Sequence, residues 1–120
     1  MRKILVVDDS ATVRLQVRET LESAGYKVIE AVDGNDGYRK IQDHPEISLI
    51  VCDYHMGSAD GFSMLAKAQS FGQSRSYKVF MLTTEASTRM IAEGKKLGVN
   101  AWIVKPVDPE ALVDAVRAIF

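Results

Sequence analysis

Five short apolar runs alternate with amphipathic stretches along the whole length of this 120-residue chain. Each run is rich in β-branched or large apolar side chains and is bounded by polar or turn residues, a pattern typical of short buried strands. The predicted strands are residues 4–7, 28–31, 49–52, 79–82 and 101–104. The alternation therefore predicts five consecutive strand–helix units, with no linker or repeat between them.

The stretches between these runs carry the start and stop signals of helices. Capping side chains or a first-turn proline open them, and glycine or proline closes them. The first, second, third and fifth predicted helices begin near Ser10, Asp33, Asp60 and Asp108. Met90, Ile91 and Leu97 mark the fourth helix. The first four helices are predicted to end at Gly25, before Pro45, at Gly72 and at Gly98, and the fifth contains Leu112, Val113, Val116 and Ile119.

The helical connections constrain how the strands can pair. Helical crossovers make neighbouring strands parallel and right-handed, which places helices on both faces of a single sheet. The first, third and fourth runs are almost wholly apolar and suit central strands, whereas Lys27 and Glu30 suit an edge strand. We therefore predict an α/β fold: a five-stranded parallel sheet in the order 2-1-3-4-5 with five helices on both faces.

The composition indicates one globular domain over residues 1–120. Its 15 Lys and Arg residues against 16 Asp and Glu residues give a net charge of −1, whereas a nucleic-acid or anionic-membrane surface needs a basic excess. Cys52 has no partner in the chain, which excludes an intramolecular disulfide scaffold and a Cys-rich zinc site. The apolar start is too short for a signal peptide, so we expect a cytoplasmic protein, and no output domain is expected.

Polar side chains that can bind a ligand or take part in a reaction follow four of the five runs directly. These strand-end residues are Asp8, Asp9, Asp53, Thr83, Thr84 and Lys105. In an open parallel sheet, ligands bind beyond the carboxyl ends of the strands, at the point where the strand order reverses. In the predicted order this point lies between the first and third strands, so the three aspartates should flank it. Adjacent strands are about 4.8 Å apart, and the long stem of Lys105 can close most of the remaining gap.

Three carboxylates gathered at one point need compensation. Each pair repels by about 4 kcal/mol at 4 Å with an effective dielectric constant near 20. A hard divalent cation with oxygen ligands would offset this repulsion, and a partly hydrated Mg²⁺ suits a site that also receives phosphate. A carboxylate, a lysine, a hydroxyl and a metal ion can together act as a phosphoryl acceptor, in which the carboxylate attacks and the others stabilise the charged oxygens.

The same residues carry a resemblance to a known family. From Lys3 to Phe120 the sequence closely resembles the receiver domain of bacterial two-component response regulators, in particular single-domain chemotaxis regulators. The resemblance is carried by Asp8-Asp9, Asp53-x-x-Met56-x-x-x-Asp60-Gly61, Thr83 after its apolar run, and Lys105-Pro106. Each motif alone is weak evidence for this family, but their joint order and spacing on five strand–helix units are specific to it. The resemblance implies a flavodoxin-like, three-layer α/β/α fold.

The resemblance implies a signalling switch rather than an enzyme. Asp53 would accept a phosphoryl group from a phosphohistidine on a sensor histidine kinase or a histidine phosphotransfer protein. The ligands of Mg²⁺ would be the carboxylates of Asp8, Asp9 and Asp53 and the backbone carbonyl of His55. Its own phosphorylation and dephosphorylation would be the only reactions that such a domain catalyses.

The remaining site residues follow from the same resemblance. Lys105 would pair with the phosphate, and Thr83 would hydrogen-bond it in the active state, with Thr84 beside it in the phosphate-binding region. Trp102 matches an aromatic position whose rotamer changes with that threonine, and the peptide bond before Pro106 would be cis. The output would be a changed protein-binding surface on the fourth helix, fifth strand and fifth helix, without direct contact to nucleic acid or membrane.

Four positions depart from the pattern of the family. Gly57 stands where the loop usually has proline and predicts a looser loop. Thr84 replaces a smaller residue and would narrow access for phosphate or water. Trp102 replaces tyrosine or phenylalanine, and its bulk opposes full burial. His55 follows the acceptor by two residues, where its side chain could contact the phosphoryl group or influence hydrolysis; a plain loop role is equally open.

Two other classes of protein share parts of this pattern. Haloacid-dehalogenase-type phosphatases also use an aspartate nucleophile, Mg²⁺, a threonine and a lysine, but their nucleophile follows the first strand in an Asp-x-Asp motif. A flavodoxin-like cofactor binder would share the strand order but needs a hydroxyl- and glycine-rich phosphate cradle after that strand. Asp8 and Asp9 stand there instead and would repel a flavin phosphate. Sustained turnover of a phosphomonoester would indicate the first alternative, and a coloured protein the second.

Overall fold

Strands and helices alternate strictly in the computed structural model, which describes residues 2–56, 60–69, 77–84 and 86–120. Within these residues the strands are β1 (Lys3–Val7), β2 (Lys27–Ala31), β3 (Ile47–Asp53), β4 (Lys78–Thr83) and β5 (Ala101–Val104). The helices are α1 (Ala11–Ser23), α2 (Gly34–Asp43), α3 (Gly61–Gln69), α4 (Thr88–Lys96) and α5 (Pro109–Ile119). The predicted alternation is confirmed, but the predicted end of the third helix at Gly72 lies outside the described residues.

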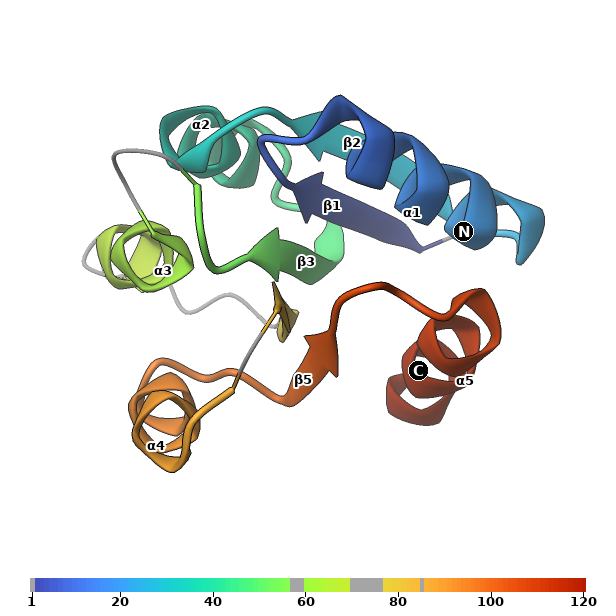
Figure 1. Cartoon of the computed structure of the whole chain (residues 1–120). Helices are drawn as coiled ribbons and strands as arrows, with labels where there is room; N and C mark the ends of the chain where they lie inside the picture. The colour runs from blue at the N-terminus through green and yellow to red at the C-terminus, as the bar shows by residue number, and fades with distance from the viewer. Residues whose placement is uncertain (1, 57–59, 70–76, 85) are drawn as a thin grey trace.

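The sheet has the predicted order β2-β1-β3-β4-β5, and every neighbouring pair is parallel. Helices α1 and α5 cover one face, and α2, α3 and α4 cover the other, which gives three layers (Figure 1). This arrangement confirms the predicted α/β class. Because the strand order reverses between β1 and β3, the carboxyl ends of these strands border the crevice in which such folds bind ligands.

The central strands are buried because helices cover both faces of the sheet. Leu5 and Val7 of β1 point into a core shared with α2 and α3, whereas Ile4 and Val6 pack on the side of α1 and α5. All four side chains are fully buried. No helix in the described part of the chain has the length and apolar character needed to cross a membrane.

Helix α4, which Met90, Ile91 and Leu97 marked in the sequence, contacts the sheet mainly through a glycine. Ile91 is 37% exposed, and among the residues of this helix only Gly94 is buried. The reason is a close approach: a Cβ atom built on Gly94 would lie 2.6 Å from Cζ2 of Trp102. Leu97 does pack against the core, but from just beyond the end of the helix. A glycine, rather than the apolar side chain of Ile91, therefore makes the contact of α4 with the sheet.

Helix α3 begins directly against the end of β3, and a glycine makes this possible. A Cβ atom built on Gly61 would lie 2.9 Å from the backbone oxygen of Asp53 and 2.9 Å from Sδ of Met81. The Gly61 backbone N–H donates to the carbonyl oxygen of Tyr54 at 2.9 Å. The start of α3 is thereby held next to the last residue of β3.

Replacing Gly61 with alanine should destabilise the fold by about 1–3 kcal/mol, the usual cost of overpacking, because the new methyl group meets backbone. Gly37→Ala in α2 is the matched control: its Cβ would meet Sδ of Met64 at 2.6 Å and the methyl groups of Val7 at 3.1 Å. A methionine side chain can shift, and alanine favours a helix interior by about 1 kcal/mol. Urea unfolding should find Gly61→Ala less stable than Gly37→Ala, and equal stabilities would contradict this role of Gly61.

Candidate functional site

Three carboxylates meet at the carboxyl ends of β1 and β3. Asp8 and Asp9 follow β1 directly, and Asp53 is the last residue of β3. One oxygen from each lies within 4.8 Å of the others. Asp8 and Asp53 are buried, whereas Asp9 is exposed. The sheet order thus brings together the acidic residues that the sequence put at strand ends, and it leaves one of them open to solvent.

Lys105 reaches these carboxylates from the far side of β4. Its side chain is 19% exposed, and its Nζ lies 3.0 Å from Oδ2 of Asp8 and 3.2 Å from Oδ1 of Asp53. Its backbone N–H donates to the carbonyl oxygen of Thr83 at 2.8 Å, and its peptide bond to Pro106 is cis, as the resemblance implied. One ammonium group therefore bridges two buried carboxylates from different strands.

The electrostatics of the site oppose ionisation of Asp53. Burial raises the pKa of Asp53 above its ordinary value, the charge of Asp8 raises it further, and Lys105 offsets part of this rise. Burial lowers the pKa of Lys105, but its hydrogen bond with Asp8 and the charges of both aspartates outweigh burial and raise that pKa overall. One ammonium against three carboxylates leaves two uncompensated negative charges, which a divalent cation would balance.

Hydrogen bonds in the loop between β1 and α1 hold Asp8 in place. Oδ1 of Asp8 accepts from the Ser10 N–H at 2.9 Å, and Ser10 caps α1 by accepting from the Val13 N–H at 3.3 Å, as predicted. Arg14 of α1 reaches back and donates to the backbone carbonyl of Asp8 at 2.6 Å. No sequence pattern indicates this role of Arg14, because an arginine on an amphipathic helix resembles an ordinary solvated charge.

The two threonines at the end of β4 lie at different depths. Thr83 is fully buried, whereas Thr84 is exposed. Thr84 lines a surface hollow together with Lys105 and Pro106. Thr83 therefore belongs to the interior side of the site, and Thr84 borders its approach from solvent.

His55 contacts Asp53 through its backbone. Its N–H hydrogen-bonds the Asp53 carboxylate, and its exposed ring lies edge-on to Tyr54 with 4.8 Å between ring centroids. The role of its carbonyl oxygen as a metal ligand stays a prediction. Gly57, the predicted cause of a looser loop, lies outside the described residues.

Trp102 packs on the same face of the sheet as Thr83. It pairs with Met81, two residues before Thr83, and its ring lies edge-on to Phe62 with 6.0 Å between ring centroids. The side chain is partly buried against the core that α2 and α3 share, in keeping with the expectation from its bulk. Gly94 leaves the space for its indole ring. Trp102 therefore connects the strand next to the site with α4.

Comparison with known proteins decides the family. A model of the response regulator receiver domain matches residues 4–117. The chain belongs to this family. Chemotaxis protein CheY1 of Helicobacter pylori is 31% identical to this receiver over 118 residues, which cover 98% of the chain and 95% of the relative.

Solved structures place the receiver among CheY-like proteins. The structure of Vibrio cholerae chemotaxis protein CheY4 is 36% identical, has a TM-score of 0.92 and is matched over 100% of this chain and 99% of that one. A Borrelia burgdorferi CheX–CheY–BeF3–Mg²⁺ complex contains a chain that is 26% identical, with a TM-score of 0.90 and coverage of 99% and 89%. CheY-like receivers are signalling proteins rather than classical enzymes, so the phosphatase and the flavin-binding alternatives are set aside.

Asp53→Asn should stabilise the metal-free fold near neutral pH. The pKa of Asp53 is raised in the native state, so its ionised form lowers the free energy of unfolding, and the amide removes that cost. The gain should be present above the native pKa of Asp53 and should shrink as pH falls through it. Urea unfolding in EDTA at several pH values measures the difference from wild type.

Asp36→Asn is the matched control and should act in the opposite direction. Burial raises the pKa of Asp36, but the Val32 N–H and the charges of Lys40 and Arg39 outweigh burial and lower that pKa overall. This variant should therefore be less stable than wild type near neutral pH, and the loss should disappear as pH falls through the native pKa. The same sign for both variants would contradict the electrostatic account of Asp53.

Proposed function

We propose that this receiver is the phosphoacceptor of a two-component system and is phosphorylated on Asp53. The main support is the Lys105 ammonium, which lies 3.2 Å from Oδ1 of Asp53 and can pair with an oxygen of an incoming phosphate. The donor is a phosphohistidine of a sensor histidine kinase or a histidine phosphotransfer protein. A carboxylate oxygen of Asp53 attacks the phosphorus, the phosphorus–nitrogen bond breaks, and the imidazole leaves with that electron pair.

The acidic residues fit a magnesium ion. Asp8, Asp9 and Asp53 offer carboxylate oxygens within 4.8 Å of one another, hard donors of the kind that Mg²⁺ prefers. The backbone carbonyl of His55 would add a further oxygen, and the exposed side of Asp9 leaves room for water. When bound, the ion would neutralise charge on the phosphoryl oxygens. The Borrelia burgdorferi CheY structure, whose complex contains BeF3 and Mg²⁺, supports this ligand class.

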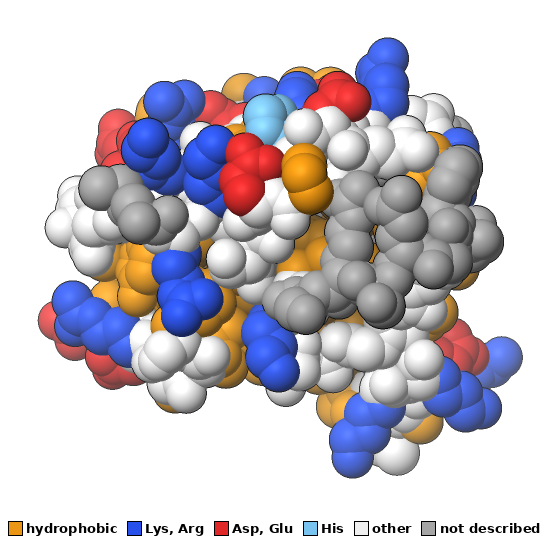
Figure 2. All heavy atoms as spheres, turned by 180° about the vertical axis from the view of Figure 1, so that it is seen from behind, with side chains coloured by type: hydrophobic (Ala, Val, Ile, Leu, Met, Phe, Trp, Pro, Cys, Tyr) orange, Lys and Arg blue, Asp and Glu red, His pale blue; other side chains and the backbone are white. Residues whose placement is uncertain are grey.

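Phosphorylation would act on the surface formed by α4, β5 and α5. Thr83, with Thr84 beside it, would gain the phosphate as a hydrogen-bond partner and move toward it, and Trp102 would repack. On this surface Ile91 and Val104 are 37% and 55% exposed. Figure 2 shows lysine and arginine side chains gathered over the projecting α4. A downstream protein with an apolar and acidic patch is the partner that suits this surface.

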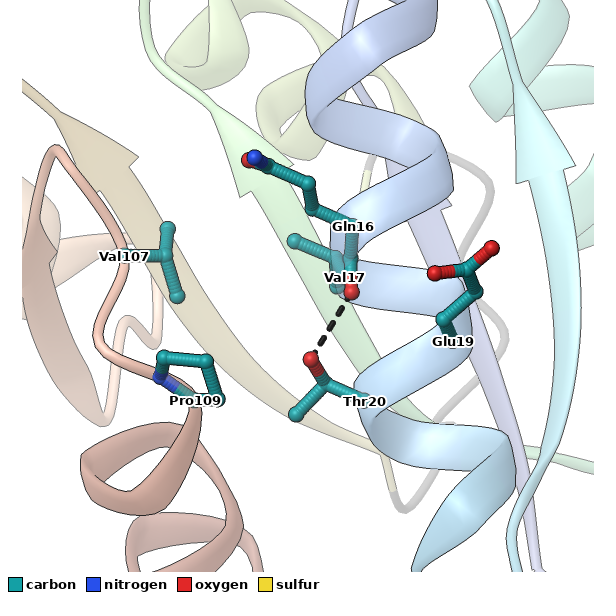
Figure 3. A pocket seen from close by; sticks show the side chains of 6 residues that line it. All are labelled: Gln16, Val17, Glu19, Thr20, Val107 and Pro109. Carbon is teal, nitrogen blue, oxygen red and sulfur yellow. Dashed lines mark hydrogen bonds between the residues drawn. The ribbon is translucent and has the colours of Figure 1, made fainter.

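The phosphodonor would approach along α1. A hollow of about 380 Å³ lies between α1 and the chain that leads into α5 (Figure 3). Its lining residues are Gln16, Val17, Glu19, Thr20, Val107 and Pro109. A second hollow shares Gln16 and Val107 with it and reaches Lys105. The two hollows lead from the surface of α1 to the site, and the encounter would take place in the cytoplasm, without nucleic acid or membrane.

Incubation with acetyl phosphate and Mg²⁺ should add one phosphoryl group to Asp53, and hydroxylamine should remove it because acyl phosphates are labile. Mass spectrometry of peptides locates the label. Asp53→Asn should abolish the label, whereas Asp36→Asn on α2 should keep it. A label that persists in Asp53→Asn, or sustained release of phosphate from a phosphomonoester, would count against the proposal.

Beryllofluoride with Mg²⁺, which mimics the phosphoryl group, should change the fluorescence of Trp102, the only tryptophan in the chain. Thr83→Ala should still bind the mimic, measured by calorimetry, because Asp53 and Lys105 are intact, but should lose most of the fluorescence change. Thr83→Ser keeps the hydroxyl and should retain the change. An undiminished response in Thr83→Ala would show that the hydroxyl does not link Asp53 to Trp102.

A further inference from the structure

The carboxylate of Asp9 is held differently from the other two acidic groups of the site. Both oxygens of Asp8 have partners, the Ser10 N–H and Lys105, and Asp53 also contacts Lys105. Asp9 is exposed, and its carboxylate makes no hydrogen bond or ion pair with the residues that the structure describes. The direction of the Asp9 carboxylate therefore depends on the backbone that carries it.

The peptide group between Asp8 and Asp9 is held by Arg14. Its carbonyl oxygen, which belongs to Asp8, accepts a hydrogen bond from Nη1 of Arg14 at 2.6 Å. A rotation of this peptide group would turn Asp9 and break that bond at the same time. The guanidinium carries a charge and its side chain is 14% exposed, so the bond is a strong one.

Glu30 of β2 holds Arg14 in this position. Nε of Arg14 lies 3.3 Å from Oε1 of Glu30, while Oε2 of Glu30 pairs with Nη1 of Arg18 at 2.7 Å. In the described structure the ion-pair partners of Arg18 are Glu30 and Glu22, neither of which belongs to the loop after β1. The two arginines thus carry the same charge on the same helix and share one partner, but Arg14 alone of the two bonds the site loop.

We infer that Arg14 is a positioning residue for the metal ligands: through the Asp8 carbonyl it aims the Asp9 carboxylate at the site that Asp8 and Asp53 form. The inference rests on the proposed function, because it concerns Mg²⁺ bound by these carboxylates. The positive charge of Arg14 would repel a cation. The hydrogen bond of Arg14 therefore raises the affinity for Mg²⁺, whereas its charge lowers it. Loss of the bond weakens Mg²⁺ binding, whereas loss of the charge alone strengthens it.

Titration of the full chain with MgCl₂, followed by calorimetry and by Trp102 fluorescence, separates these two effects. Arg14→Gln should weaken the affinity about tenfold, the lower end of the losses seen when a group that orients a metal ligand is removed. Arg18→Gln is the matched control and should bind Mg²⁺ as tightly as wild type or more tightly. Arg14→Lys keeps the charge and one donor and should recover part of the affinity.

Urea unfolding without Mg²⁺ distinguishes positioning from a general loss of stability. Each glutamine variant removes an ion pair with Glu30 and one further contact, to the Asp8 carbonyl for Arg14 and to Glu22 for Arg18. Both variants should therefore lose similar stability, while only Arg14→Gln loses Mg²⁺ affinity. Binding by Arg14→Gln that is as tight as binding by Arg18→Gln would overturn the inference. Failure of the wild type to bind Mg²⁺ would instead overturn the proposed function.

Discussion

The contact of one lysine with two buried aspartates is the interaction on which the site depends. Asp8 is fully buried and Asp53 nearly so, and two carboxylates this close repel each other unless a cation lies beside both. Lys105 supplies that cation from the end of β5, across the intervening strand β4. The contact requires parallel strands in the order β2-β1-β3-β4-β5, because parallel strands end at the same edge and β5 lies one strand beyond the neighbour of β3. The fold and the site therefore share one requirement.

Two glycines determine how closely the helices approach this edge. Gly61 lets α3 begin against the backbone of Asp53, and Gly94 lets α4 rest on the ring of Trp102. A glycine in a helix interior is less stable than alanine by about 1 kcal/mol, so Gly94 gives up helix stability for a close approach. Gly94 also explains how the large indole ring of Trp102 fits here, since the helix rather than the strand leaves the space. Trp102 also packs edge-on against Phe62 of α3. Helices α3 and α4 therefore both contact β5 through this one indole ring.

The apolar runs predicted the strands and their order, and parallel topology then predicted that the aspartates and the lysine would meet. Features that depend on backbone approach were not predictable in this way. Ile91 is exposed because Gly94 makes the contact of α4 with Trp102. A periodic pattern of apolar residues does not indicate a contact that depends on the small size of glycine. Thr84 follows Thr83 but is exposed, because successive residues at a strand end face opposite ways. The contact of Arg14 with the site loop was not predictable, because its partner is the backbone carbonyl of Asp8, which no pattern of side chains indicates.

The surplus of negative charge at the carboxyl ends of β1 and β3 makes this edge of the sheet costly to fold. Burial and the charge of Asp8 both raise the pKa of Asp53, so the ionised form of Asp53 carries an electrostatic cost in this fold. A site with fewer carboxylates would be more stable, but it would attract a divalent cation less strongly and would leave phosphoryl oxygens without compensation. The proposed phosphorylation of Asp53 would add further negative charge to the same residue, and this charge would need Lys105, a cation and new hydrogen-bond donors. Under the proposed function, the repulsion at this edge would therefore give phosphate and cation a large effect on local packing, which would pass through Thr83 to Trp102 and α4.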